Sequence, residues 1–401
     1  MGLRGLRCVY SALLGITSTQ FDNNDGLVWI SELSCAAWIS FEAGRFKNHS
    51  GLARAWLLCN KGCVPMRLTQ FAKLSCLTLL LCAALPLSGQ TAGDPGLKIF
   101  NLAAAQPTTP TPPTPAVALV GGGADVDEAM EFLCQNSGGG NIVVLRASGD
   151  DDYNPYFHNL CLHNSVTTLL ITSVEGARDP AAAEILRNAH AIFIAGGDQF
   201  NYVKMWTGNP VQAEINEAIA RGVPIGGISA GLAVLGEFAF SARHDTVTSP
   251  EALANPYDEK VSVERNFFSI PLMKGIITDS HFSKRERMGR TLVFLSRIVQ
   301  DGWSERGHAI GIDERTAVLV DAKGHAKIVG KGEAFFISLH QKPEICAKGE
   351  PLTARRFNLY VKSTGGKFDL TTWDPGNCEL PFVVEVVDGK VNGWPTFVEG
   401  R

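Results

Sequence analysis

Several patterns that would define a cofactor, metal or nucleic-acid site are missing from this sequence. The glycines at residues 121–123 do not complete a Gly-x-Gly-x-x-Gly pattern, because Val126 stands at the sixth position, and no Gly-x-x-x-x-Gly-Lys-Ser/Thr phosphate loop occurs. The nine histidines form no His-Glu-x-x-His pair and no clustered Cys/His spacing. A net charge of −4, without a basic patch interleaved with aromatics, disfavours nucleic acid. We expect neither a metal nor a cofactor.

Cysteine is scarce in the body of the chain. Six of the ten cysteines lie before residue 90, which leaves Cys134, Cys161, Cys346 and Cys378. In an exported chain these four can pair, and the sequence-near choices are Cys134 with Cys161 and Cys346 with Cys378. Four cysteines allow three connectivities, and buried free thiols are an equal alternative.

The first 92 residues read as two segments outside the folded body. Residues 1–65 show no sustained periodicity and no alternation of strands with turns, so we expect no fold there and interpret them as a miscalled upstream segment. From Met66 a basic start, an apolar run and a small polar exit are typical of a secretory signal at residues 66–92. A membrane anchor is the alternative, but the run is shorter than the ~20 residues that span a bilayer. We expect the mature protein to be secreted or periplasmic.

A proline- and threonine-rich run follows the predicted signal. Residues 106–115 contain prolines that can join neither a helix nor an inner strand. We therefore interpret residues 93–115 as an extended linker, with the folded domain starting near Ala116.

Short apolar runs alternate with helical patterns beyond the linker. The runs predicted as strands lie at residues 117–123, 141–148, 165–173, 190–199 and 223–225. This alternation predicts a doubly wound α/β domain with a mostly parallel sheet over residues 116–340. In such sheets, ligands gather beyond the carboxyl ends of the strands. Further strand patterns predict a small β-rich carboxyl-terminal extension at residues 341–401.

The sequence Gly-Ile-Ser-Ala-Gly at residues 227–231 joins a buried strand to a helical run. A turn this sharp strains its central residue and projects that side chain at the sheet edge, so Ser229 is a candidate nucleophile. The alternative is a glycine-rich turn in which Ser229 merely caps the helix. The backbone N–H groups of Ala230 and of Gly196 or Gly197 are candidates for an oxyanion hole.

A serine nucleophile requires a base and a carboxylate that orients the base. His281 lies at a predicted strand-to-helix junction, where it can face the same crevice as Ser229. Glu314 lies between two later strands and is the candidate acid. Asp245 and Asp313 are loop carboxylates that remain alternatives for this third position.

Three arginines follow His281 closely. On a helix, Arg287 and Arg290 would share a face, and Arg285 would lie about 160° from Arg287. The pattern suits a solvated charged face as well as a binding site.

Four motifs occur together in this chain, at residues 195–199, 227–231, 279–290 and 311–314. In this order they resemble the cyanophycinases of the S51 serine peptidase family, relatives of aspartyl dipeptidase, over residues 116–340. The resemblance implies a class I glutamine-amidotransferase-like fold. It also implies Ser229 as nucleophile, His281 as base and Glu314 as acid.

The resemblance further implies a substrate pocket. Its residues would be Gln199, Asp279, Ser280, Arg285, Arg287 and Arg290, with Ser280 standing where the family commonly has glutamine. Cyanophycin is a polyaspartate that carries arginine on its side-chain carboxyls. Arginines suit its carboxylates, and Asp279 with Gln199 suit its guanidinium groups.

These inferences predict an exported serine peptidase that hydrolyses this β-linked Asp-Arg polymer to short β-Asp-Arg units through an acyl-enzyme. The alternatives are an aspartyl or isoaspartyl dipeptidase with the same triad, and a non-catalytic amidotransferase-like binding module. The resemblance suggests a homodimer, and we expect no stable membrane insertion after removal of the signal.

Overall fold

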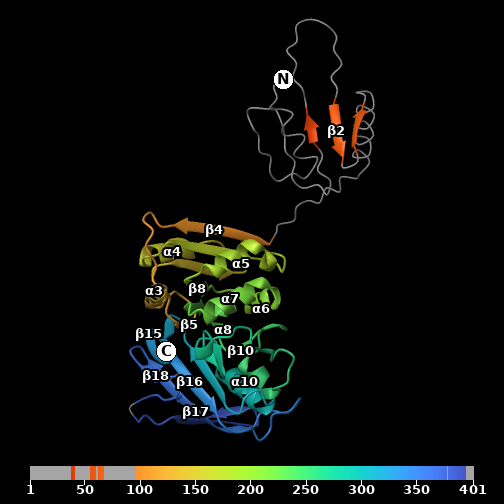
Figure 1. Cartoon of the computed structure of the whole chain (residues 1–401). Helices are drawn as coiled ribbons and strands as arrows, with labels where there is room; N and C mark the ends of the chain where they lie inside the picture. Colours follow the sequence, from red (N-terminus) through yellow and green to blue (C-terminus); the bar gives the residue numbers. More distant parts are fainter. Residues whose placement is uncertain (1–37, 41–54, 60–61, 67–95, 377, 394–401) are drawn as a thin grey trace. The chain divides into compact units, whose positions relative to one another are not determined.

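Two compact units divide the chain, at residues 1–91 and 92–401. The computed structural model describes residues 38–40, 55–59, 62–66, 96–376 and 378–393 (Figure 1). In the first unit, three short strands form an antiparallel sheet: β1 (Trp38–Ser40), β2 (Ala55–Cys59) and β3 (Gly62–Met66). These paired strands lie in the segment for which the sequence analysis expected no fold. Apart from Met66, the predicted signal lies outside the described residues.

A nine-stranded sheet forms the larger part of the second unit. Its five central strands are parallel, in the order β5-β9-β8-β6-β7, and antiparallel strands extend it on both sides. The nine strands in spatial order are β18 (Lys367–Asp369), β15 (His325–Gly330), β14 (Thr316–Val320), β5 (Val117–Val120), β9 (Ile225–Ile228), β8 (Ala191–Ile194), β6 (Asn141–Arg146), β7 (Ser165–Ile171) and β4 (Leu97–Ala103). The central strands β5, β8 and β9 are buried along their whole length, as expected for parallel strands covered on both faces.

Helices cover both faces of this sheet. The helices are α3 (Asp127–Asn136) and α4 (Tyr153–Leu160) on one face, and α5 (Pro180–Arg187), α6 (Gln199–Trp206) and α7 (Pro210–Ala220) on the other, beside the short 3-10 helix η1 (Gly176–Arg178). Local chemistry starts α5, because the side chain of Asp179 accepts the N–H of Ala181 and Pro180 supplies a preset first residue. The predicted doubly wound α/β fold is confirmed.

A second, eight-stranded sheet packs against the same core. Its strands in spatial order are β11 (Val263–Arg265), β10 (Phe238–Phe240), β12 (Ile276–Asp279), β13 (Gly307–Ile312), β16 (Glu333–Leu339), β17 (Ala354–Ser363), β19 (Phe382–Val387) and β20 (Lys390–Asn392). Three helices and one 3-10 helix accompany it: α8 (Ala230–Ala233), α9 (Ser249–Ala254), α10 (Met288–Gln300) and η2 (Pro271–Met273). Helix α10 buries its apolar face against this sheet.

Strands occur beyond residue 340, as the sequence predicts, but they are not a separate extension. β17 pairs with β16 over residues 333–338, and β18 pairs with β15 in the other sheet. Residues 341–393 therefore complete both sheets of the body, because their apolar side chains gain cover only by joining strands already present.

The interpretation of residues 93–115 as a linker is wrong for β4, which pairs with all seven residues of β7. After this edge strand, the N–H of Thr108 donates to Asn164 Oδ1 at 2.6 Å, and the N–H of Thr111 donates to Gly138 O at 3.0 Å. The body thus begins before the proline run, not after it. The sequence did not predict this strand. Only Leu97 of β4 is buried, because β4 lies at the edge of the sheet, and such a strand needs no continuous apolar run that would mark it.

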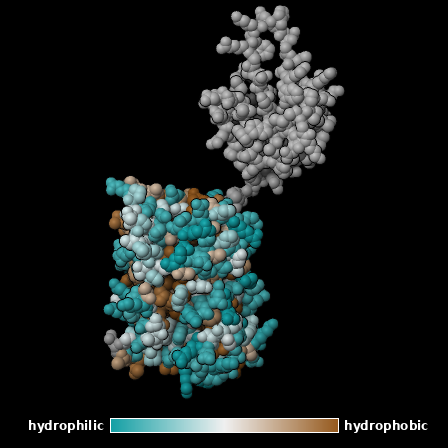
Figure 2. All heavy atoms as spheres, in the orientation of Figure 1, coloured by the Kyte–Doolittle hydropathy of each residue, from teal (hydrophilic) through white to brown (hydrophobic). Residues whose placement is uncertain are grey.

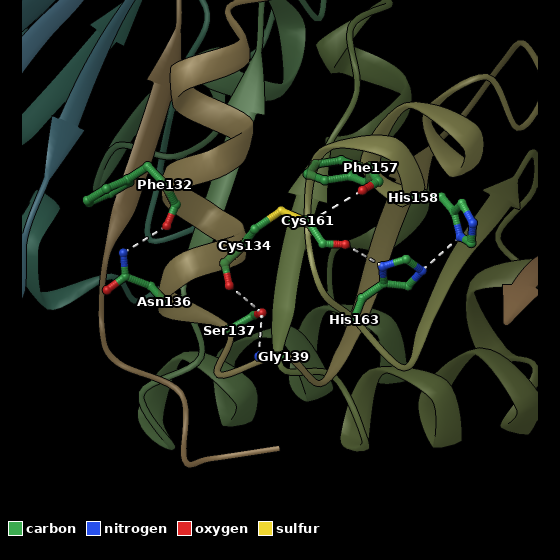
Figure 3. The surroundings of a disulfide bond; sticks show 9 residues. All are labelled: Phe132, Cys134, Asn136, Ser137, Gly139, Phe157, His158, Cys161 and His163. Atoms are coloured by element: carbon green, nitrogen blue, oxygen red, sulfur yellow. Dashed lines mark hydrogen bonds between the residues drawn. A yellow bond between two sulfur atoms is a disulfide. The ribbon is translucent and has the colours of Figure 1, made fainter. Parts of the chain in front are cut away.

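One predicted disulfide is present and the other is absent. Cys134 at the end of α3 is bonded to Cys161 after α4, with Cα atoms 5.8 Å apart (Figure 3). This bond closes a loop of sequence separation 27, for which chain entropy predicts about 3–4 kcal/mol of stabilisation. Cys346 and Cys378 are both free in the described part of the chain, one buried and the other exposed. Their predicted pairing is wrong.

Polar residues cover most of the described surface on the face drawn in Figure 2. Among the described residues, no helix has the length and apolar character needed to cross a membrane.

Candidate active site

Ser229 occupies a strained turn between β9 and α8. Its backbone angles are φ 54° and ψ −111°, a region that residues other than glycine rarely adopt. A Cβ atom at Gly227 would lie 2.5 Å from the carbonyl carbon of Gly231, and one at Gly231 would lie 2.0 Å from Ile194 O. The turn therefore requires both glycines. The Ser229 side chain makes no capping hydrogen bond to the helix, which argues against the capping alternative.

His281 and Glu314 complete a hydrogen-bonded chain with the serine. Ser229 Oγ lies 2.7 Å from His281 Nε2, and His281 Nδ1 lies 2.8 Å from Glu314 Oε1. An ionised Glu314 accepts the proton on Nδ1, so Nε2 is left to accept the serine hydroxyl. This is the geometry of a nucleophile, a general base and an orienting acid.

The two alternative carboxylates are not the third member. Asp313 uses Oδ1 to accept the N–H of Ser283 at 2.9 Å and Oδ2 to accept the N–H of Glu333 at 3.2 Å. Asp245 is exposed and accepts the neighbouring N–H of Thr246. Asp313 thus shapes the turn that presents Glu314.

Gly122 is a site residue that the sequence analysis did not assign. A Cβ atom there would lie 2.5 Å from both Cε1 and Nε2 of His281, and its φ is +104°. The neighbouring backbone is bonded to His281 and to the residue after Glu314: the N–H of His281 donates to Gly121 O, and the N–H of Arg315 donates to Gly122 O, both at 2.8 Å. The signal in the sequence was the triple glycine directly after a predicted strand.

Two of the predicted oxyanion-hole residues, Gly196 and Ala230, lie next to Ser229. A Cβ at Gly196 would lie 3.6 Å from Ser229 Cβ, and Ala230 is the first residue of α8. The hydroxyl of Tyr202 lies 3.0 Å from Gly196 O and can donate to it. Because a trans peptide points its N–H away from its carbonyl, this contact directs the N–H of Gly197 away from Tyr202.

Asp279 is not open to a substrate, contrary to the pocket that the resemblance implies. It is buried, its Oδ1 accepts Arg290 Nη2 at 2.6 Å and Arg287 Nη1 at 3.1 Å, and its Oδ2 accepts Arg290 Nε at 2.8 Å. Burial alone would raise the pKa of Asp279, but the guanidinium groups of Arg290 and Arg287 hold that pKa below its ordinary value. Arg290 is equally buried, so neither residue of this pair can meet a ligand.

The remaining predicted pocket residues differ in access. Ser280 is buried, with its carbonyl 2.8 Å and its hydroxyl 3.2 Å from Arg287 Nη1. Gln199 is half-buried and donates to Phe240 O at 3.2 Å. Arg285 is exposed. Helix α10 begins at Met288, so the expected helical face shared by Arg287 and Arg290 is not formed: Arg290 lies within the helix, and Arg287 is its N-cap residue. Arg285 precedes the helix.

Comparison with known proteins assigns the chain to a family. The model of Peptidase family S51 matches residues 123–328, just over half of the 401 residues. The chain belongs to this family. It is a serine-type peptidase, and all three residues of the Ser-His-Glu chain lie within the matched range.

Two curated relatives of this S51 peptidase are described as cyanophycinases. The protein of Geminocystis herdmanii is 28% identical over 279 residues, covering 65% of this chain and 95% of the relative. That of Trichormus variabilis is 27% identical over 190 residues, covering 46% of this chain and 58% of the relative. A crystal structure of a peptidase from an acI-B1 Actinobacterium has 17% identity and a TM-score of 0.43, covering 64% of this chain and 97% of that one.

The charge state of the triad suits base catalysis near neutral pH. Burial is the largest cause that lowers the pKa of His281. The hydrogen bond that His281 donates to Glu314 opposes this lowering, and the charges of Arg285 and Arg287 add to it. The hydrogen bond from His281 is the main cause that lowers the pKa of Glu314. Both shifts favour a neutral imidazole and an ionised carboxylate near neutral pH, the states that base catalysis requires. Among the described residues, no group of three or more His, Cys, Asp or Glu side chains could hold a metal ion.

We predict that Gly122→Ala lowers kcat by roughly 100-fold or more, because the new methyl group displaces the imidazole and a displacement of about 1 Å can cost this much. Peptidase assays with thermal melts measure the effect. The matched control is Gly208→Ala, which also has a positive φ, +71°, but no atom within 4 Å of the added Cβ. Equal activity losses in the two variants would contradict the prediction.

We predict an acid limb of kcat/KM below the ordinary pKa of histidine, about 6.5. The neutral imidazole is the active form, so a lowered pKa preserves activity at lower pH. Arg285→Ala removes a cation that disfavours the imidazolium, so the limb shifts to higher pH. Arg356→Ala, which removes an exposed arginine of β17, serves as the control. A shift of the Arg285→Ala limb to lower pH would contradict the prediction.

Proposed function

We propose that this S51 peptidase hydrolyses cyanophycin, the β-linked Asp-Arg polymer, to short β-Asp-Arg units through an acyl-enzyme. The observation that carries the proposal is the hydrogen-bonded Ser229–His281–Glu314 chain, with both contacts below 3 Å. The substrate class is supported by the curated relatives described as cyanophycinases, which are 24–28% identical over up to 282 residues.

In this mechanism the Oγ of Ser229 attacks the scissile carbonyl while its proton passes to Nε2 of His281. Glu314 stabilises the resulting imidazolium through Nδ1. The carbonyl oxygen becomes an oxyanion, for which the N–H groups of Ala230 and of Gly196 or Gly197 are the candidate donors. Cleavage of the C–N bond then transfers the proton from Nε2 to the leaving amine and leaves the acyl group on the serine. A water molecule repeats the sequence and frees the acid.

Recognition of the polymer requires contacts for carboxylates and for guanidinium groups. Arg285 is exposed and close enough to His281 to influence its pKa, so it is placed to meet a substrate carboxylate. Arg287 contacts Asp279 and Ser280 through Nη1 alone, and its Nε and Nη2 have no partner among the described residues. Arg285 and Arg287, with the half-buried Gln199, form the revised pocket.

We predict that Ser229→Ala lowers polymer hydrolysis by about 10⁴-fold or more, since loss of a triad nucleophile removes the acyl-enzyme route. Digestion of insoluble cyanophycin followed by mass spectrometry measures the products, which we expect to be β-Asp-Arg units. The same variant should lose labelling by a fluorophosphonate probe.

Different outcomes identify the rival functions. Faster turnover of free Asp-X or isoaspartyl dipeptides than of polymer would favour a dipeptidase. An unlabelled Ser229 in the wild-type protein would favour a non-catalytic module. Full polymer hydrolysis by Ser229→Ala would refute the assigned nucleophile.

We also propose that the protein is exported, with a signal at residues 66–92, and forms a homodimer. The Cys134–Cys161 disulfide supports an oxidising compartment. Processing must precede Leu97, because β4 belongs to the sheet. Amino-terminal sequencing of the natural protein should therefore start between residues 93 and 97. Recovery of peptides from residues 1–65 would contradict this, and sedimentation analysis tests the dimer.

A further inference from the structure

The turn that presents His281 is supported from below by a buried charged cluster. The cluster consists of three residues. Asp279 ends β12, Arg290 lies in the first turn of helix α10, and Arg287 is the N-cap residue of that helix. No residue of the triad touches Asp279 directly. The backbone of Ser280 connects the cluster to the catalytic histidine.

We infer that Asp279 and Arg290 are positioning residues, which hold the imidazole of His281 against Ser229, and that they do not bind substrate. The inference rests on the proposed triad. It departs from the pocket implied by the resemblance, in which both residues would contact the polymer.

Three contacts to the backbone fix the two peptide units that precede the histidine. Asp279 Oδ1 accepts the N–H of Ser280 at 2.9 Å, and Arg287 Nη1 donates to Ser280 O at 2.8 Å. The N–H of His281 donates to Gly121 O at 2.8 Å. Asp279 thus acts on the histidine through Ser280. It binds the N–H of Ser280 itself, and it holds Arg287, which binds the carbonyl of Ser280.

His281 needs such support because its backbone is strained. Its φ is +47°, in the left-handed region that residues other than glycine adopt uncommonly. Relaxation of this turn would rotate the imidazole away from Ser229 Oγ, which it contacts at 2.7 Å. A cluster that fixes the preceding peptide opposes this relaxation.

The surroundings of Arg290 show that it is committed to the protein. Besides its two bonds to Asp279, its Nη1 lies 3.3 Å from both Thr246 Oγ1 and Val247 O. Its guanidinium carbon lies 4.8 Å from the ring centre of Phe240 and 5.8 Å from that of Phe294. Because Arg290 is buried, its guanidinium group is not accessible to a substrate carboxylate.

A fluorophosphonate probe separates positioning from substrate binding, because it reacts with an activated serine and contains neither aspartate nor arginine. We expect Asp279→Asn in the full chain to lower the rate constant of Ser229 labelling by 30-fold or more and to alter its pH profile. For polymer fragments, kcat should fall by a similar factor while KM changes less than threefold.

Asp301→Asn is the matched control. It removes the carboxylate from another arginine pair on the same helix, in which Arg297 Nη2 lies 2.9 Å from Asp301 Oδ2, away from the histidine. We expect its labelling rate to stay within twofold of wild type. An equal loss in this variant would show a general effect of helix destabilisation and overturn the inference.

Arg290→Lys keeps the charge but cannot make the two-pronged contact, and it provides a second variant if Asp279→Asn fails to fold. We expect slowed labelling with a wild-type circular dichroism spectrum, and partial rescue of Arg290→Ala by added methylguanidinium. If Asp279→Asn or Arg290→Lys labelled at the wild-type rate and had a raised KM, the positioning role would be overturned, but the proposed function would stand. Failure of the wild-type protein to label would instead overturn the proposed function.

Discussion

Catalysis in this molecule depends on the two sheets keeping a fixed position relative to each other. Ser229 follows β9 in the nine-stranded sheet, whereas His281 follows β12 in the eight-stranded sheet. Glu314 lies in the turn where the chain passes from β13 in one sheet to β14 in the other. A hydrogen bond of 2.7 Å between serine and histidine therefore joins two separately built layers.

Backbone contacts make this junction rigid. Carbonyl oxygens in the loop after β5 accept hydrogen bonds from the N–H groups of His281 and Arg315. The end of this one strand therefore holds both the histidine base and the turn that contains Glu314. Gly122 permits that approach because its missing side chain leaves room for the imidazole. The strands after residue 340 add to the same rigidity by extending both sheets around the shared core.

The charged residues near the active site fall into a buried pair and an exposed arginine. Asp279 and Arg290 are taken from solvent together, which is favourable only because each satisfies the other with short paired bonds. Arg285 remains in solvent, where its charge is available to a ligand and acts on His281. The motif of residues 279–290 thus contains two kinds of arginine, one internal and one accessible.

Local apolar runs, glycine spacing and motif chemistry were enough to predict the parallel α/β core, the serine turn and the order of the catalytic residues. The sequence could not identify β4, whose residues gain order only from pairing with β7. It could not separate Asp279 from a ligand-binding carboxylate, and it left Asp313 as an alternative to Glu314. Those distinctions depend on which side chains meet across distant segments, and only tertiary packing decides burial and hydrogen-bond partners.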